Sequence, residues 1–329
     1  MSTDNLAALK SLLGDEPRPA VTVHRFDRRE VKDALQKSHG TETGPKFRKA
    51  FNAKGTSATD KVKKRTSLKT AFASSKLLNL ATRVLPITKK PSGIRTDFAQ
   101  NPVPDSTQSP YCQIGICFVQ SGDSSTYCTG ALVGPNAVLT VGNAIPWNST
   151  PWYMQFIPAY NNGNAPFGVI NVSQVWGYNP NGSCTDDYLV CHLETSIGNE
   201  LGYFGVYGST NGGDYQAAGS EFWNSVGYPN QTVQITATNF GIDNTGTSDY
   251  GGSVDLDTQA FIQGGWVGGP VWAQYAFNGT NGDDGPFICG VVAGGGISVD
   301  FWGNVNQYQV NEGGMDMLSL AFYAQDNWL

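Results

Sequence analysis

Short apolar runs separated by turn residues fill the chain from Tyr111 onward. The runs are rich in Val, Ile, Phe, Tyr and Trp, which favour strands, and Gly, Asn, Pro and Asp stand between them. We expect strands at 115–119, 130–139, 152–157, 168–177, 188–193, 221–228, 231–240, 270–272 and 287–293. Strands this short and this closely spaced predict an all-β sandwich or a pair of barrels.

The pattern before residue 96 is different. Helix-forming composition with patchy helical periodicity occurs at 6–13, 29–36 and 61–84. The last of these stretches begins with the basic run Lys61-Val-Lys-Lys-Arg65. We therefore predict a basic, partly helical or disordered segment over residues 1–105 and one β-rich domain over residues 106–329.

Charge divides the chain at the same place. All 21 Lys and Arg lie at or before Arg95, where eight acidic residues leave a net charge of +13. The other 19 acidic residues give the body a net charge of −19. A body without cations has little with which to hold phosphate, so we expect no nucleic-acid partner for it. Acidic pairs such as Asp186-Asp187 and Asp283-Asp284 lack the spacing of a calcium loop, and we expect neither a metal nor a cofactor.

Three roles are open for the basic segment. It could bind nucleic acid or an anionic membrane surface, it could be a pro-segment docked by charge on the acidic body, or it could be a solvated arm. Lys89-Lys90 and Arg95 would suit processing by a dibasic-specific or trypsin-like protease. Met1 is not followed by the apolar stretch of a secretory signal, and no run has the roughly 18 apolar residues of a membrane span.

Three segments carry motifs with chemical meaning. Cys128 begins CTGALVGPNAVLTVGNA, Asp187 begins DYLV, and Gly265 begins GWVGGPVW. In this order they resemble the CTGxLVGPxxVLTAAHC, DYAV and GxSGGPVW boxes of chymotrypsin-like serine proteases. FIPAYNNG from Phe156 and ICGVVAGGG from Ile288 are similar to stretches of the glutamyl-endopeptidase-like branch of that family. The resemblance covers about 190 residues and implies two six-stranded Greek-key barrels with a cleft between them.

The resemblance also implies that the catalytic chemistry has been lost. Asn143 takes the place of the general-base histidine, Val267 takes that of the nucleophilic serine, and only Asp187 keeps the family residue. An amide is no useful base near neutral pH, and a valine offers no nucleophile. His192 is the only histidine after residue 95, and along one strand it would lie roughly 16 Å from Asp187.

Further site positions follow from the same resemblance. The backbone N–H groups of Gly265 and Val267 correspond to an oxyanion hole. Val292 and Gly294 correspond to the specificity pocket, where Val292 replaces the histidine of the glutamyl-specific branch. Gly268, Gly269 and Asp187 also have a plain structural explanation, because tight turns need glycine and a buried carboxyl can accept hydrogen bonds.

The disulfide pairing is open. The chain has six cysteines, which allow up to three disulfides: Cys112, Cys117, Cys128, Cys184, Cys191 and Cys289. The resemblance places the usual partner of Cys128 at Ala144, so Cys128 pairs elsewhere or stays a thiol. Cys112–Cys117 and Cys184–Cys191 are candidate pairs because they are close in sequence.

We expect a catalytically inactive protease homologue that binds a protein or peptide at its vestigial cleft. Its compartment would be extracellular or an organellar lumen. Aromatic anchors for the partner stand near the boxes, at Trp147, Trp152, Trp266 and Trp272. One alternative is an active serine-type endopeptidase with a non-standard site, for example one that uses His24 or His39. The other is a structural protein of a matrix, wall or granule.

Overall fold

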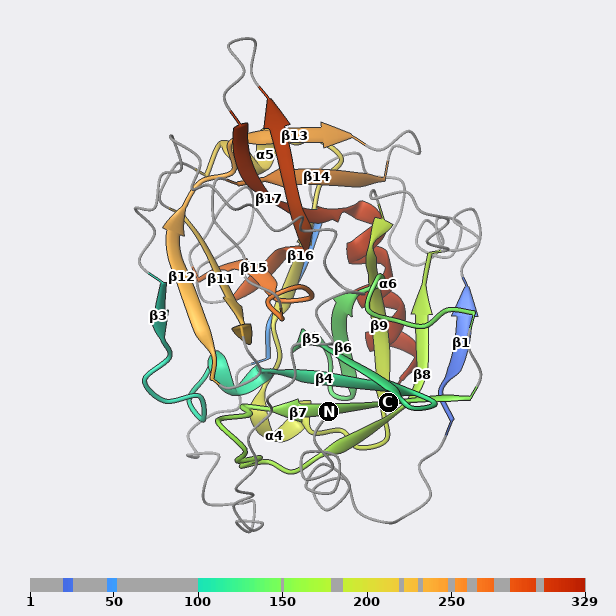
Figure 1. Cartoon of the computed structure of the whole chain (residues 1–329). Helices are drawn as coiled ribbons and strands as arrows, with labels where there is room; N and C mark the ends of the chain where they lie inside the picture. The colour runs from blue at the N-terminus through green and yellow to red at the C-terminus, as the bar shows by residue number, and fades with distance from the viewer. Residues whose placement is uncertain are drawn as a thin grey trace.

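The computed structural model of the protein describes residues 20–25, 46–51, 100–148, 151–178, 186–218, 222–229, 233–247, 252–258, 265–274, 285–299 and 305–328. Most of these residues form strands, and the strands make two sheets (Figure 1). The helices expected at 6–13, 29–36 and 61–84 lie outside the described residues.

The first sheet contains a closed barrel of six antiparallel strands. They are β4 (Ile114–Ser121), β5 (Ser124–Leu132), β6 (Ala137–Val141), β7 (Trp152–Pro158), β8 (Ile170–Gly177) and β9 (Tyr188–Leu193). The pairing order is β8-β7-β4-β5-β6-β9, and β8 pairs with β9 to close the ring. The strand predicted over 130–139 is wrong as a single element, because Gly134-Pro135 turns the chain between β5 and β6.

The second sheet has ten strands among the described residues, four more than the six expected for the second barrel. They are β2 (Lys46–Arg48), β3 (Gln100–Pro102), β10 (Gly205–Gly208), β11 (Trp223–Gly227), β12 (Ile235–Phe240), β13 (Asn244–Thr247), β14 (Ser253–Asp257), β15 (Pro270–Ala273), β16 (Phe287–Val299) and β17 (Val305–Gly314). The extra strands include β3, which pairs with β12, and the β13–β14 hairpin, which pairs with β17. The long β16–β17 hairpin projects at the top of Figure 1.

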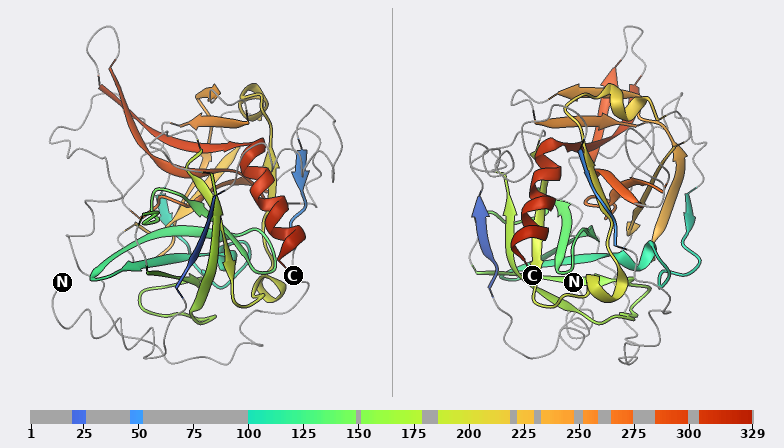
Figure 2. Two further views of the ribbon diagram at one scale, coloured as in Figure 1. Left: turned by 90° about the vertical axis from the view of Figure 1, so that its right-hand side faces the viewer. Right: turned by 180° about the vertical axis from the view of Figure 1, so that it is seen from behind.

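The described helices are few and short, apart from the last one. The helical elements among the described residues are the 3-10 turn η2 (Tyr111–Gln113), α4 (Gly198–Leu201), α5 (Gly213–Gln216) and α6 (Met315–Asn327). Helix α6 was not predicted from the strand-rich pattern. It buries Met317, Leu318, Leu320 and Ala321 in a hydrophobic cluster that includes residues of both sheets. Figure 2 shows α6 running down from the second sheet along the first barrel.

Two stretches of the basic segment dock on the body. Strand β1 (Thr22–Arg25) pairs in parallel with β8, and β2 pairs antiparallel with β10 (Figure 2, right). Phe51 and Tyr203 exchange two backbone hydrogen bonds of 3.0 and 2.9 Å, and their rings stack with centroids 5.4 Å apart. These two stretches therefore add one strand to each sheet. Removal of this segment as a pro-segment stays a prediction, as does the boundary after residue 105, although β3 already belongs to the second sheet.

A substitution at Val21 tests how much the docked arm contributes to the stability of the protein. The Val21 side chain is 7% exposed and packs in the hydrophobic cluster that contains the first-barrel residues, and its N–H donates to the Trp152 carbonyl at 3.0 Å. Val21→Asp buries a charge without a partner and should lower the free energy of unfolding by about 2–4 kcal/mol, measured by urea denaturation. Thr22→Asp is the matched control, because Thr22 is exposed in the same strand. Equal effects of the two variants would contradict the docking of Val21.

Candidate functional site

The first and third boxes meet at one stretch of β16. The Asn143 Nδ2 group donates to the Ala293 carbonyl at 3.0 Å. The Gly268 N–H donates to the Val292 carbonyl at 2.7 Å, and the Val292 N–H donates to the Gly269 carbonyl at 2.9 Å. Neighbouring residues of β16 thus hold the turn of the first box and the loop of the third box.

Asp187 lies at the joint between the two sheets, directly before β9. Its side chain is 8% exposed, and the Asp187 N–H donates to Glu312 Oε2 at 2.8 Å across to β17. Burial raises the pKa of Asp187 to about 7, and the nearby amides of Asn143 and Gly142 oppose part of this rise. Its Oδ1 atom is buried with no hydrogen-bond partner among the described residues. Among the described residues, no imidazole lies against this carboxyl group.

Gly265 and Val267 are held through their carbonyl groups. Thr129 Oγ1 donates to the Gly265 carbonyl at 2.7 Å, and the Thr129 N–H donates to the Val267 carbonyl at 2.8 Å. Gly265 and Gly268 have φ angles of 94° and 87°, which favour glycine. A Cβ atom at Gly268 would overlap the carbonyl oxygen of Thr129. Packing alone therefore requires glycine at Gly268, whatever the loop does chemically.

The two positions expected at the specificity pocket differ in their surroundings. Val292 is fully buried in the core of the second sheet. Gly294 is half-buried, and a Cβ atom there would meet nothing within 4 Å among the described residues. A register shift between Val292 and Gly294 in the pairing with β17 separates the two environments. Open space at this site therefore lies at Gly294 and not at Val292.

The two described histidines, His24 and His192, pack against tryptophans and do not contact Asn143 or Asp187. Nε2 of His192 lies 3.0 Å from Asn136 Nδ2, and its ring stacks on Trp328 with centroids 4.7 Å apart. His24 on β1 stacks on Trp176 at 4.0 Å. Burial lowers the pKa of both imidazoles. His39 lies outside the described residues.

The structure corrects the set of aromatic anchors. Trp152, Trp266 and Trp272 are 0%, 1% and 6% exposed, so they belong to the core and cannot contact a partner. Trp147 is half-buried, and its Nε1–H donates to the Gly142 carbonyl at 2.8 Å, one residue before Asn143. Only Trp147 of these four remains available at the surface beside the site.

Neither candidate cysteine pair is formed among the described residues, where Cys112, Cys117, Cys128, Cys191 and Cys289 carry no disulfide. The Cys112 thiol points from η2 to the Leu201 carbonyl, with a sulfur–oxygen distance of 3.7 Å. Cys117 points instead into the first barrel. Closeness in sequence fails as a guide here, because the turn and the strand direct the two side chains apart. Cys184 lies outside the described residues.

Glu312 is a buried carboxyl group that sequence reasoning missed. It is 0% exposed on β17, and its Oε1 atom has no partner among the described residues. Burial raises the pKa of Glu312 to about 9, and the negative charges of Asp187 and Asp255 add to the rise. The available signal was the absence of Lys and Arg, because any acid buried in this body lacks a cationic partner. Among the described residues no three His, Cys, Asp or Glu side chains are arranged to hold a metal ion.

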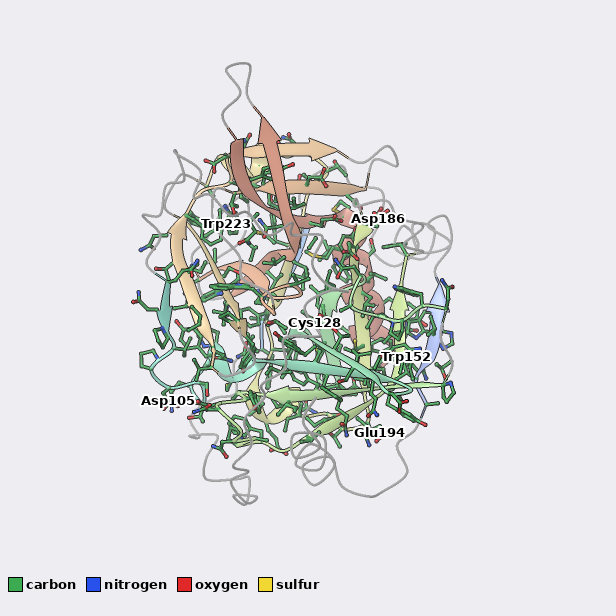
Figure 3. The ribbon with its side chains drawn as sticks, in the orientation of Figure 1. Asp105, Cys128, Trp152, Asp186, Glu194 and Trp223 are labelled. Atoms are coloured by element: carbon green, nitrogen blue, oxygen red, sulfur yellow. The ribbon has the colours of Figure 1, made fainter. Side chains whose placement is uncertain are left out.

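Asp186 belongs to a neighbouring polar network. Its carboxylate accepts from Ser253 Oγ, which lies 2.6 Å from the Tyr188 hydroxyl (Figure 3, where Asp186 is labelled). These three groups are almost fully buried. The network therefore joins β9 to β14 but offers no nucleophile that a substrate could reach.

Comparison with known proteins supports the fold. No family model matches the chain. An extracellular metalloprotease of Bacillus subtilis is 29% identical over 131 residues, which make up 38% of this chain and 42% of that protein. The chain thus spans about two-fifths of the length of the curated relative that it matches.

The solved structures that resemble the chain include proteases. A Glu endopeptidase matches with a TM-score of 0.51 and 19% identity, over 71% of this chain and 100% of that one. The protease Anisep from Arthrobacter nicotinovorans has a TM-score of 0.47 and 19% identity, over 70% and 99% of the two chains. The protein therefore has the chymotrypsin-like double-barrel fold, as the sequence predicted. Among the described helices, none is long and apolar enough to cross a membrane.

The raised pKa of Glu312 predicts how the free energy of unfolding depends on pH. A carboxyl group whose pKa is raised by folding keeps its proton in the native state and releases it on unfolding, so stability falls as pH rises from about 4.5 toward 9. Glu312→Gln keeps the size and an acceptor for the Asp187 N–H. It should raise the free energy of unfolding by about 2–3 kcal/mol at pH 7 and by little at pH 4. Urea denaturation across this pH range measures both values.

The exposed Glu200→Gln is the matched control. The same gain in stability for Glu312→Gln at pH 4 and pH 7 would show that Glu312 does not carry the pH dependence.

Proposed function

We propose that the chain is a catalytically inactive homologue of serine endopeptidases that binds a protein or peptide at the surface formed by Asn143, Trp147 and Gly294. The observation that carries this proposal is the state of Asn143. The family's base position holds an amide whose Nδ2 group donates to the Ala293 carbonyl at 3.0 Å. An amide nitrogen in this contact has no lone pair for a substrate proton.

The remaining triad positions support inactivity. Val267 is 4% exposed and packs in a hydrophobic cluster that includes residues of both sheets, so the nucleophile position is filled by an apolar side chain. Asp187 can exchange a proton near neutral pH, but it is buried, with no described histidine against it. General-base catalysis needs a base within hydrogen-bond reach of the nucleophile. Neither partner is present among the described groups at this site.

The surface itself suits an extended ligand. Asn143 is exposed, Trp147 is half-buried beside it, and Gly294 leaves open space on the strand that holds Asn143. An aromatic ring next to exposed amide and backbone groups offers both apolar contact and hydrogen bonds. The acidic body, with no Lys or Arg after Arg95, favours a neutral or basic partner over a nucleic acid. The name of the extracellular relative supports secretion of the protein.

Restoring the triad tests the loss of catalysis. The unmodified protein should not react with a fluorophosphonate probe. Asn143→His with Val267→Ser places an imidazole beside Asp187 and a hydroxyl beside the imidazole, and should raise the labelling rate at least about 100-fold. Val267→Ser alone is the control and should stay unlabelled for want of a base.

Labelling of the unmodified chain by the probe would refute the proposal that the protein is catalytically inactive. A folded double variant that stays inert would refute the oxyanion-hole role of the Gly265 and Val267 N–H groups.

A bulky side chain at Gly294 tests the binding surface. Peptides selected on the full chain from a displayed random library should bind Gly294→Leu at least about tenfold more weakly, because the leucine fills the open space. Fluorescence anisotropy of labelled peptides measures the affinity. Ser124→Leu is the control, because Ser124 is exposed at the far end of β5. Equal affinities for Gly294→Leu and the unmodified chain would place binding elsewhere.

A further inference from the structure

Two thiols face each other inside the first barrel. Cys117 on β4 is the direct cross-strand partner of Cys128 on β5. Directly opposite residues of an antiparallel pair lie about 4.5–5.5 Å apart at Cα and project to the same face. A disulfide needs about 4.4–6.8 Å between Cα atoms. The register therefore meets the backbone requirement for a bond between these two sulfur atoms.

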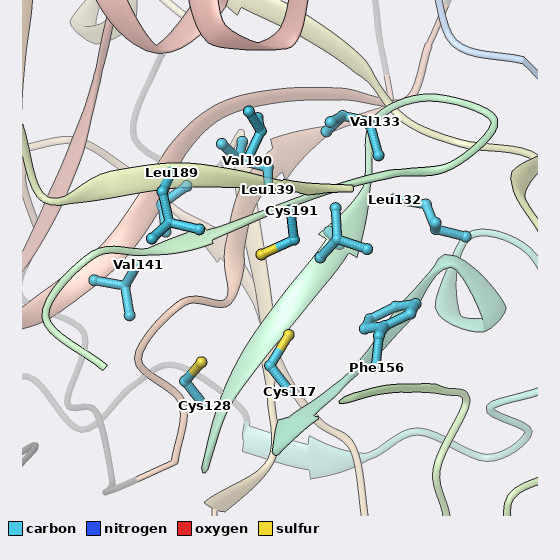
Figure 4. Close-up of a cluster of buried hydrophobic side chains, with 14 of the residues drawn as sticks. Cys117, Cys128, Leu132, Val133, Leu139, Val141, Phe156, Leu189, Val190 and Cys191 are labelled. Atoms are coloured by element: carbon cyan, nitrogen blue, oxygen red, sulfur yellow. The ribbon is translucent and has the colours of Figure 1, made fainter. Parts of the chain in front are cut away.

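The surroundings leave room for this bond. Both side chains are at most 1% exposed, and Figure 4 shows their sulfur atoms on adjacent strands within the core. A Cβ atom at Gly130 would lie only 2.7 Å from Cys117 Sγ, so glycine at this position makes space for the sulfur. On the other side, Cys128 Sγ lies 3.3 Å from Thr140 Oγ1.

The other described cysteines are poorer partners. Cys191 lies on β9, which is separated from β5 by β6, and its thiol donates to Met154 Sδ at 3.7 Å. Cys112 points to the Leu201 carbonyl, and Cys289 lies in the core of the second sheet. Cys117 is thus the described cysteine best placed for Cys128.

We propose that Cys117 and Cys128 form a disulfide while the chain folds in an oxidising compartment. A thiolate of one cysteine attacks a small-molecule or protein disulfide and releases one thiol from it. The second cysteine then attacks the mixed disulfide and releases the other thiol. The two cysteines lose two electrons and two protons, and the oxidant disulfide is reduced to two thiols.

The bond has to form before the barrel closes. In the folded chain both sulfur atoms are buried, and burial together with the neighbouring Cys128 raises the pKa of the Cys117 thiol. A buried thiol with little thiolate neither attacks an oxidant nor meets one. The disulfide is therefore a permanent crosslink of the β4–β5 hairpin and not a reversible switch.

The crosslink also bears on the binding surface. Residue Thr129 follows Cys128 and holds the carbonyls of Gly265 and Val267 in the second half of the molecule. Fixing Cys128 to β4 therefore limits the motion of the strand on which this loop depends.

Thiol counting tests the proposal on the full chain. After refolding with oxidised and reduced glutathione, the protein is denatured and alkylated, and its intact mass gives the number of labels. Four labels are expected, against six for protein kept reduced throughout. Protein folded in reductant and exposed to oxidised glutathione only afterwards should still give six labels.

Single variants identify the pair. Cys117→Ala and Cys128→Ala should each give five labels, because the remaining partner stays free. Cys191→Ala is the matched control and should give three, because the pair remains intact. Cleavage before Asp123 splits the hairpin between the two cysteines, so a linked pair of peptides reports the bond without any variant. Six labels after oxidative refolding, three labels in Cys117→Ala, or a linked peptide containing Cys184 would overturn the proposal.

Discussion

The carboxyl groups of Asp187 and Glu312 lie buried in a body that contains no lysine or arginine. A buried carboxylate is costly unless a cation or several donors compensate it. Here the compensation comes from the backbone, since the Asp187 N–H donates to Glu312 Oε2 and so joins β9 of the first sheet to β17 of the second. Burial also raises the pKa of Glu312 to about 9. The Glu312 carboxyl group therefore stays protonated and uncharged near neutral pH, which removes the cost of burying its charge. The joint between the two sheets thus depends on a proton where other proteins use an ion pair.

The remainder of the site depends on the same joint. Thr129 holds the loop of Val267, and residues Val292 and Ala293 of β16 hold Gly268, Gly269 and Asn143. None of these contacts needs a histidine or a serine. These hydrogen bonds hold the backbone around the first and third boxes and stabilise the packing of one half of the molecule on the other.

Much of the fold could be predicted from the sequence. Alternating apolar runs located most strands of the first barrel, and the box resemblance supplied the double-barrel arrangement that spacing alone leaves open. Helix α6 was missed, because its buried residues contribute to a core that is otherwise built from strands. Strand β1 was missed as well, because a four-residue strand takes its stability from pairing with β8 and not from its own pattern.

The candidate site was predictable in position but not in exposure. The box alignment identified Asn143 and Val267, whereas only coordinates separate the open space at Gly294 from the buried Val292. The core location of Trp152 and Trp266 was equally hidden, because a tryptophan near a motif in sequence can face either way. Glu312 was out of reach, because its link to Asp187 spans 125 positions.

The two positions that the box resemblance aligns with a catalytic serine and histidine differ in their surroundings. Val267 is an apolar side chain in the core, so its position adds to packing and is closed to any ligand. Asn143 is polar and exposed, and its hydrogen bond to Ala293 keeps the turn tied to β16. A position that served stability alone could bury an apolar group here as well. Asn143 instead stays exposed beside Trp147, and an exposed polar residue next to an aromatic ring suits a surface that recognises a partner.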